Sequence, residues 1–113
     1  DWINKLQHQP NNITVGNLDT WIDISDVRDV VRAYRLIAQP QFNRQTFNVG
    51  SGKATRSGEI MEILKNLIGI RCDIAELQPG THYLPIADIS HITKQTHWIP
   101  TISITQMLQD CLE

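Results

Sequence analysis

Residues 19–34 have the sequence DTWIDISDVRDVVRAY, which decides the fold because it joins a strand-like segment to a capped amphipathic helix. The hydroxyl of Ser25 is placed to cap that helix, and carboxylates near its start favour the positive amino end of the helix dipole. Pro40 ends the pattern. We therefore expect a helix whose apolar side chains, repeating at three and four, form one buried stripe: Val27, Val30, Val31, Tyr34, Ile37 and Ala38.

The flanking segments predict further short elements. Residues 13–15 and 21–24 surround Gly16 and Asn17, which predicts two strands or extended arms about a tight turn. Residues 46–49 predict a buried strand, and residues 72–77 another. Between them we expect a helix that is capped by Ser57 and ends at a left-handed Gly69. Its buried stripe comprises Ile60, Ile63, Leu64, Leu67 and Ile68.

The last third of the chain predicts two more helices. Residues 77–89 are irregular, and a short helix is expected from Ser90 to near Trp98. Ser103 and Gln106 have the spacing of a capping box. The final helix should bury Ile104, Leu108, Cys111 and Leu112. The prediction is a mixed α/β fold forming a single domain over residues 1–113.

Composition excludes several classes of partner. The chain has 113 residues and a net charge of −2, and it shows no basic block for nucleic acid or an anionic membrane. It has no apolar run of the length that crosses a bilayer. Cys72 and Cys111 lack a Cys-x-x-Cys spacing, so we expect free, buried thiols in a reducing cytoplasm. The chain opens at Asp1 without a Met, and we expect it to be a fragment of a longer protein.

The search for catalytic and metal-binding motifs yields exclusions. Residues 50–53, GSGK, follow the expected strand, but Phe47 and Ala54 stand where a phosphate loop needs Gly and Ser or Thr. Thr55 stands where a dinucleotide fingerprint needs its third Gly, so we interpret the segment as a turn. No Ser, His and acid have the context of a nucleophile. No pair of histidines has the spacing of metal ligands, and no metal is expected at His8, His82, His91 or His97.

The densest charged group is Asp23, Asp26, Arg28 and Asp29. These carboxylates either line a substrate pocket or cap the helix and lie on its solvated face. The second interpretation is favoured, because acids in a first turn complement the helix dipole and Asp29 precedes Arg32 by three residues.

Three motifs in matching order resemble a known family. They are VGNLD at residues 15–19, DVRDVVRAY at 26–34 and FNVGSG at 47–52, and Trp98-x-Pro100 follows them. Together they resemble the carboxyl-terminal, substrate-binding part of extended short-chain dehydrogenase/reductases, in the branch of GDP-mannose 4,6-dehydratase and GDP-4-keto-6-deoxymannose reductase. The resemblance covers residues 13–113.

The resemblance implies a two-lobed parent enzyme. Its amino-terminal Rossmann lobe would hold NAD or NADP and a catalytic Tyr-x-x-x-Lys, and this lobe would close over a nucleotide-sugar. Tyr34 and Tyr83 are followed four residues later by Ala38 and Ala87, so neither has that Lys. We therefore expect no catalytic residue and no cofactor site in this chain, and the missing Rossmann lobe is its expected partner.

The same resemblance implies the substrate-binding residues Asn17, Ile22, Asp23, Gln78 and Thr81. Family members usually carry Arg at the positions of Ile22 and Gln78 and an acid at that of Thr81. An Arg forms charge-assisted bonds to a diphosphate, which Ile cannot form and Gln replaces only with neutral ones. Replacement charges are available from Lys53, Arg56 and Arg71.

Two functions follow. The first is the substrate-binding lobe of an NAD(P)-dependent nucleotide-sugar dehydratase, epimerase or reductase serving polysaccharide biosynthesis. The second is a degenerate, non-catalytic binding or protein-interaction module derived from that family. Restoring Arg at positions 22 and 78 is the test that distinguishes a surviving pocket from a lost one.

Overall fold

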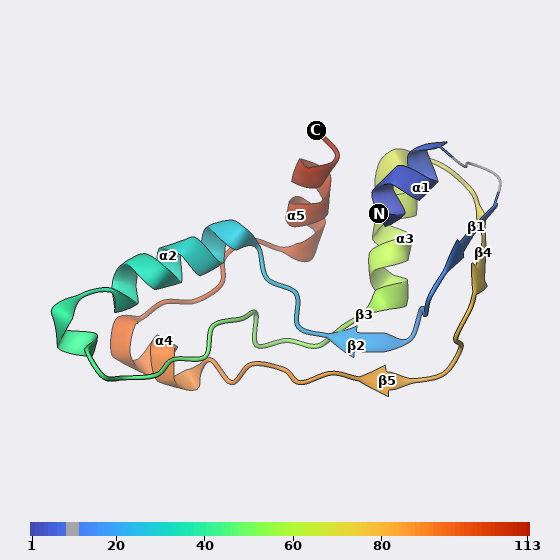
Figure 1. The fold of residues 1–113 in the computed structure, drawn as a ribbon. Helices are drawn as coiled ribbons and strands as arrows, with labels where there is room; N and C mark the ends of the chain where they lie inside the picture. The colour runs from blue at the N-terminus through green and yellow to red at the C-terminus, as the bar shows by residue number, and fades with distance from the viewer. Residues whose placement is uncertain (9–11) are drawn as a thin grey trace.

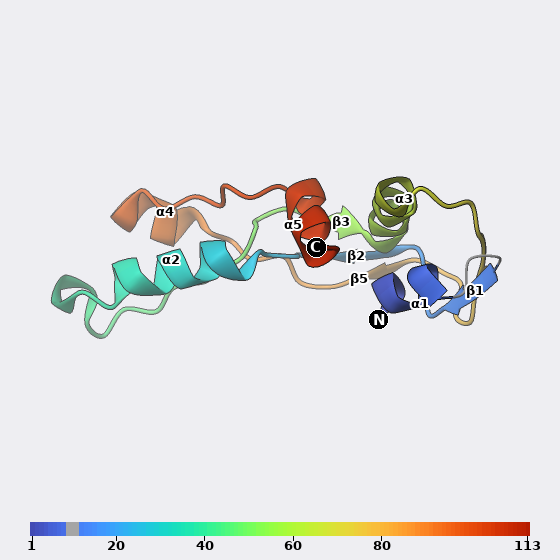
Figure 2. The ribbon, with the colours of Figure 1, turned by 90° about the horizontal axis from the view of Figure 1, so that it is seen from above.

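The computed structural model describes residues 1–8 and 12–113 and confirms a small mixed α/β fold. The molecule is long and flat, with extents of 54 × 31 × 16 Å. Figures 1 and 2 show α1, α3, β1 and β4 at one end and α2 and α4 at the other. The elements are α1 (Trp2–His8), β1 (Asn12–Val15), β2 (Thr20–Ile22), α2 (Val27–Ile37), η1 (Pro40–Phe42), β3 (Thr55–Arg56), α3 (Ser57–Ile68), β4 (Asp73–Glu76), β5 (His82–Tyr83), α4 (Ser90–Thr96) and α5 (Ile104–Cys111).

The first end holds the larger hydrophobic core. β1 and β4 pair in parallel with Ile13 opposite Ile74, and α1 and α3 pack beside them. Alternation along β1 sends Ile13 and Val15 inward, where they meet Leu6 of α1 and Met61 of α3. This core forms because each element contributes one apolar face to it.

A three-stranded sheet with the order β3-β2-β5 lies in the middle of the molecule. β2 pairs antiparallel with β3 and parallel with β5. The expected strands at residues 13–15 and 21–24 therefore exist, but they belong to different sheets. The amino end of α3 is tied to the turn between them, where the Gly58 N–H donates to the Leu18 carbonyl at 2.8 Å.

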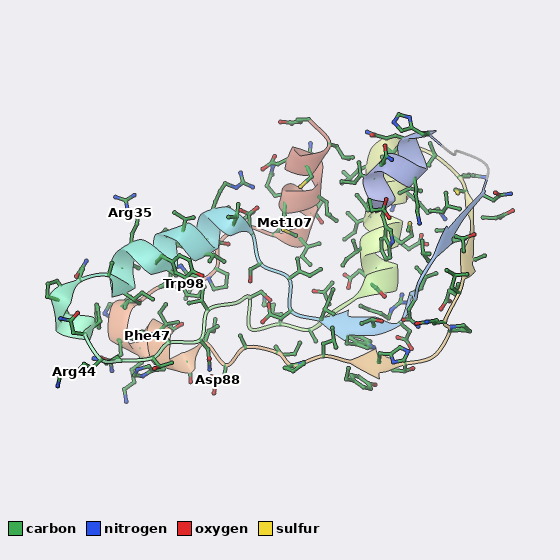
Figure 3. All side chains as sticks on the ribbon, viewed as in Figure 1. Arg35, Arg44, Phe47, Asp88, Trp98 and Met107 are labelled. Carbon is green, nitrogen blue, oxygen red and sulfur yellow. The ribbon has the colours of Figure 1, made fainter. Side chains whose placement is uncertain are left out.

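The second end has a smaller core, centred on Trp98. The indole of Trp98 is 1% exposed and packs with Ala33 of α2 and Ile92 of α4. Its Nε1 donates to the Asp29 carbonyl at 3.0 Å. Figure 3 shows Trp98 between α2 and α4, with Phe47 beside α4.

The helix predicted from residues 19–34 forms as α2, but its cap and its buried face differ from the prediction. Asp26, and not Ser25, is the N-cap, and its carboxylate accepts from the Arg28 N–H. The predicted buried stripe is wrong for Val27, Val31 and Tyr34, which are 70%, 49% and 58% exposed, whereas Ile37 packs against the smaller core. The buried residues of α2 are Asp29 and Ala33.

Three further predictions, on residues 46–49, Ser57 and Cys111, are wrong. Residues 46–49 form no strand, because no described strand lies beside them to complete a ladder. Ser57 is the first residue of α3 and does not cap it, since its hydroxyl bonds with the Asn17 carbonyl and the Thr20 N–H. Cys111 is exposed on the last turn of α5, whereas Cys72 is buried as expected.

Local signals elsewhere are confirmed. Gly69 caps α3 with a φ of 80°, and the strand expected at residues 72–77 forms as β4. The Ser103 hydroxyl accepts from the Gln106 N–H and caps α5. The predicted buried stripe of α5 is wrong, because none of its residues is fully buried: Ile104 and Leu112 are half-buried and Cys111 is exposed, although Leu108 packs against the larger core. None of the helices in the described part of the chain has the length and apolarity needed to cross a membrane.

Candidate functional site

Asn17 is the centre of a polar cluster at the turn between β1 and β2. Its side-chain N–H groups donate to the carbonyls of Gln78 and Gly80, at 2.5 and 2.8 Å. Its Oδ1 accepts from the Asp19 N–H and the Thr20 hydroxyl, at 2.7 and 2.8 Å. The Asn17 amide therefore joins the β1–β2 turn to the loop that precedes β5.

Asp19 extends this cluster and brings in Thr81. The Thr81 hydroxyl donates to Asp19 Oδ2 at 2.5 Å, and the indole N–H of Trp21 donates to Asp19 Oδ1 at 3.1 Å. In the parallel register Trp21 lies opposite Tyr83, and their rings stack with centroids 6.5 Å apart and an interplanar angle of 17°. Sequence reasoning missed Asp19, Trp21 and Tyr83 as members of this cluster.

Of the five predicted site residues, three come together and two lie elsewhere. Asn17, Gln78 and Thr81 meet around the β1–β2 turn, although Gln78 takes part through its main-chain carbonyl. Ile22 pairs with Thr55 of β3 and packs against the larger core. Because side chains alternate along a strand, Ile22 and Trp21 point to opposite faces of the sheet.

Asp23 holds two loops together. Its carboxylate accepts from the Ser51 N–H at 2.8 Å, the Ser51 hydroxyl at 2.6 Å, the Gly52 N–H at 3.2 Å and the Ala87 N–H at 3.1 Å. Burial alone would raise the pKa of Asp23, but the bonds from Ser51, Ala87 and Gly52 outweigh burial and lower it. Gly50 is required here, since a Cβ would lie 2.8 Å from Asp23 Oδ2.

Asp29 is not on the solvated face that the sequence favoured. It is 3% exposed, and its carboxylate accepts from the N–H groups of Thr101 and Ile102 and from the Thr101 hydroxyl, at 3.0 to 3.2 Å. Burial would raise its pKa, but these bonds and one from Arg32 lower it. Asp26 is also buried, at 7% exposure. It caps α2, as the sequence analysis expected of the carboxylates near the start of this helix.

A separate pocket of about 530 Å³ opens between residues 51–55 and residues 99–104. Its walls combine isoleucine side chains with hydroxyl groups, and Lys53 is the charged residue in its lining. None of the five predicted site residues lines it. The pocket therefore adds apolar volume on a part of the molecule distinct from the Asn17 cluster.

Comparison with known proteins gives the fold a context. No family model matches the chain. GDP-6-deoxy-D-mannose reductase of Pseudomonas aeruginosa is 28% identical over 109 residues, which span 92% of this chain and 36% of that protein. The structure of RMD from Pseudomonas aeruginosa complexed with NADPH superposes with a TM-score of 0.84 and 26% identity, over 98% of this chain and 38% of that one. The chain resembles one part of an extended short-chain dehydrogenase/reductase.

Two other solved structures share the fold of this chain. A UDP-galactose 4-epimerase matches with a TM-score of 0.78 and 25% identity, over 98% of this chain and 38% of that one. The dTDP-glucose 4,6-dehydratase of Bacillus anthracis, in complex with NAD, matches with a TM-score of 0.84 and 16% identity, over 98% and 36%. The chain thus spans somewhat more than a third of each relative.

The amino ends of α2 and α3 are poorly suited to the phosphates of NAD or NADP. A dinucleotide phosphate needs a helix amino end with free N–H groups. In α3 the Gly58 N–H is bonded to the Leu18 carbonyl, and a Cβ on Gly58 would lie 2.6 Å from that oxygen. In α2 the Asp26 carboxylate occupies the amino end and would repel a phosphate. Neither helix offers a dinucleotide site.

Proposed function

We propose that this chain is the substrate-binding lobe of an NAD(P)-dependent enzyme that modifies a nucleotide-linked sugar, with a GDP-sugar as the favoured substrate. The observation that carries the proposal is the superposition on RMD with a TM-score of 0.84 at 26% identity. The sequence similarity to GDP-6-deoxy-D-mannose reductase supports the choice of GDP. A cytoplasmic location and a single domain over residues 1–113 belong to the same proposal.

The Asn17 cluster is the proposed contact with the nucleotide-sugar. Asn17 fixes the backbone of residues 78–80, so the side chains of Gln78 and Thr81 stand on an ordered loop. Both side chains are exposed and neutral, and they can bond sugar or phosphate oxygens. Asp23 is proposed as a positioning residue, because its carboxylate already bonds Ser51, Gly52 and Ala87.

This chain would bind and orient the substrate and exclude water from it. Hydride transfer and proton transfer require the nicotinamide and the Tyr-Lys pair, which the family resemblance assigns to another lobe. Affinity is expected to be low, since neutral hydrogen bonds to a diphosphate are weaker than those from Arg. Such an affinity suits a lobe that closes over a ligand held mainly elsewhere.

Binding of GDP by the protein as its gene encodes it tests this proposal. Gln78→Arg should tighten GDP binding about tenfold in calorimetric titration, because one charge-assisted bond contributes roughly 1.5 kcal/mol or more. Gln41→Arg is the matched control, since Gln41 is exposed in η1 and adds the same charge far from the cluster. If Gln78→Arg and Gln41→Arg bind GDP with equal affinity, Gln78 does not contact the nucleotide.

The position of Ile22 supports a second candidate function, that of a non-catalytic binding module. Its side chain packs against the larger core at the position where the family resemblance places a diphosphate-binding Arg. An Arg at position 22 would cost stability by placing a guanidinium beside that core, so the test at position 78 is the cleaner one. Turnover of GDP-linked or UDP-linked sugars by the intact protein would exclude this second candidate.

A further inference from the structure

The pocket between residues 51–55 and residues 99–104 has the size and the lining of a small-molecule site. Its volume is about 530 Å³, and the pockets that hold small ligands usually enclose roughly 300–1,000 Å³. Among the described residues, no aromatic ring lines it. Its apolar surface is aliphatic, and the isoleucines that line it are Ile24, Ile89, Ile99, Ile102 and Ile104.

A carboxylate holds each of the two loops that form this pocket. Asp23 accepts from the N–H groups of residues 51 and 52, at 2.8 and 3.2 Å. Asp29 of α2 accepts from the N–H groups of residues 101 and 102, both at 3.1 Å. Because these bonds fix the main chain on both sides, the pocket is formed before a ligand enters. A preformed site binds its ligand at a lower cost in conformational entropy.

Lys53 supplies the charge of the pocket. The Ser51 hydroxyl accepts from the Lys53 N–H at 3.1 Å, which fixes the main chain that carries this side chain. Lys53 is exposed, and its ammonium forms no ion pair with the carboxylates that the structure describes. An unpaired cation at the edge of an apolar pocket attracts an anionic group of a ligand.

The lining also distinguishes between classes of anion. A diphosphate carries several charges and is typically held by Arg side chains, which bond two oxygens at once. A nucleobase is often held by stacking on an aromatic ring, and the described lining provides none. One carboxylate on an aliphatic chain matches a single ammonium beside isoleucine side chains.

We propose that this pocket binds a small aliphatic carboxylate, with the chain against the isoleucines and the carboxylate beside the Lys53 ammonium. The proposal goes beyond the nucleotide-sugar function, because neither the Asn17 cluster nor Asp23 lines the pocket. The ligand would contact both loops, so its binding should also raise the melting temperature of the protein.

Methyl NMR of the protein as its gene encodes it, labelled at isoleucine, tests the proposal with octanoate as the probe. Octanoate should shift the methyl signals of Ile89, Ile99 and Ile102 in a saturable titration. The signals of Ile13 and Ile60, which lie in the larger core, should not move. Octylammonium has the same chain length and the opposite charge, and it should bind about fivefold more weakly because Lys53 repels it.

Substitutions at Lys53 test the contribution of its charge. Lys53→Gln should raise the dissociation constant of octanoate about threefold, as expected for the loss of one exposed ion pair. Lys53→Arg keeps the charge and should retain the affinity. Lys94→Gln is the matched control, because Lys94 is exposed on α4 and lies outside the pocket lining. It should leave the dissociation constant unchanged.

Three results would overturn the proposal. Without a saturable shift at the pocket isoleucines, the pocket is closed to this ligand. Equal affinities for octanoate and octylammonium would show that the site does not recognise an anion. Displacement of octanoate by GDP would assign the pocket to the nucleotide-sugar site. Octanoate binding in a protein that binds no GDP would retain this pocket and reject the proposed function, so the two proposals fail separately.

Discussion

Replacing Asp29 by Ala is expected to detach residues 98–102 from α2. The carboxylate of Asp29 holds that segment through the N–H of Thr101, the N–H of Ile102 and the hydroxyl of Thr101, and these partners lie 72 and 73 residues away in the sequence. The Trp98 indole packs in the same junction. Loss of one side chain therefore affects the whole of the smaller core.

The magnitude follows from the three donors. Hydrogen bonds to a charged group contribute about 1.5–3 kcal/mol each. Thr101 is exposed and Ile102 half-buried, so water replaces part of what is lost. We therefore expect Asp29→Ala to lower the free energy of unfolding by about 3 kcal/mol, which is less than the roughly 4.5 kcal/mol that three such bonds would give at the low end of the range. Urea denaturation followed by tryptophan fluorescence measures it.

Asp73→Ala is the matched control, because Asp73 is exposed on β4 and makes no side-chain hydrogen bond within the described residues. It should change the free energy of unfolding by no more than about 0.5 kcal/mol. A loss below about 1 kcal/mol for Asp29→Ala would refute the reasoning, since the loss of one ordinary hydrogen bond would account for it.

The pH dependence of Asp29 gives a second measurement on the same residue. Its folded-state pKa is below the ordinary value of 3.8, because the bonds from Ile102, Arg32 and Thr101 outweigh the effect of burial. The ionised carboxylate therefore stabilises the fold above that ordinary pKa, and the contribution is lost as the pH falls through the lowered one. Asp29→Asn should flatten the decline in stability between about pH 5 and pH 2.

Two other substitutions test the packing of helix ends. Gly58→Ala should lower the melting temperature although Ala favours helices, because its Cβ would lie 2.6 Å from the Leu18 carbonyl oxygen. Gly16→Ala is the control, because a Cβ there would meet nothing within 4 Å. Equal melting temperatures for the two variants would contradict the expected clash at Gly58. Asp26→Ala should cost about 1 kcal/mol through loss of the α2 cap, with little from the exposed Arg28 pair. Asp26→Asn should recover most of that stability in urea denaturation, because Asn also caps, and failure to recover it would assign the effect to the ion pair.

The sequence by itself determined the features that depend on neighbouring residues. Gly69 predicts the left-handed end of α3 because a residue without a Cβ adopts positive φ without strain. Ser103 and Gln106 predict the start of α5 because the capping bond spans three residues. The family motifs likewise pointed to Asn17 and Thr81, which meet in one cluster, but they also selected Ile22, which the sheet directs toward the core.

Only the tertiary structure decided which donors and strands meet across long sequence separations. Ser25 and Ser57 have cap-like sequence contexts, yet Asp26 caps α2 and the hydroxyl of Ser57 bonds to Asn17 and Thr20. The acidic Asp29 is buried because Thr101 supplies donors from a distant segment. Trp21 and Tyr83 meet through the β2–β5 register, which no local pattern encodes.

The apolar periodicity of α2 shows where the two kinds of information separate. Periodicity establishes that a helix has an apolar face, because side chains three and four residues apart share one side. It does not specify what covers that face, since the covering surface comes from another part of the fold. Trp98 packs with Ala33 on one side of the helix, whereas Val31 and Tyr34 on the other side are exposed.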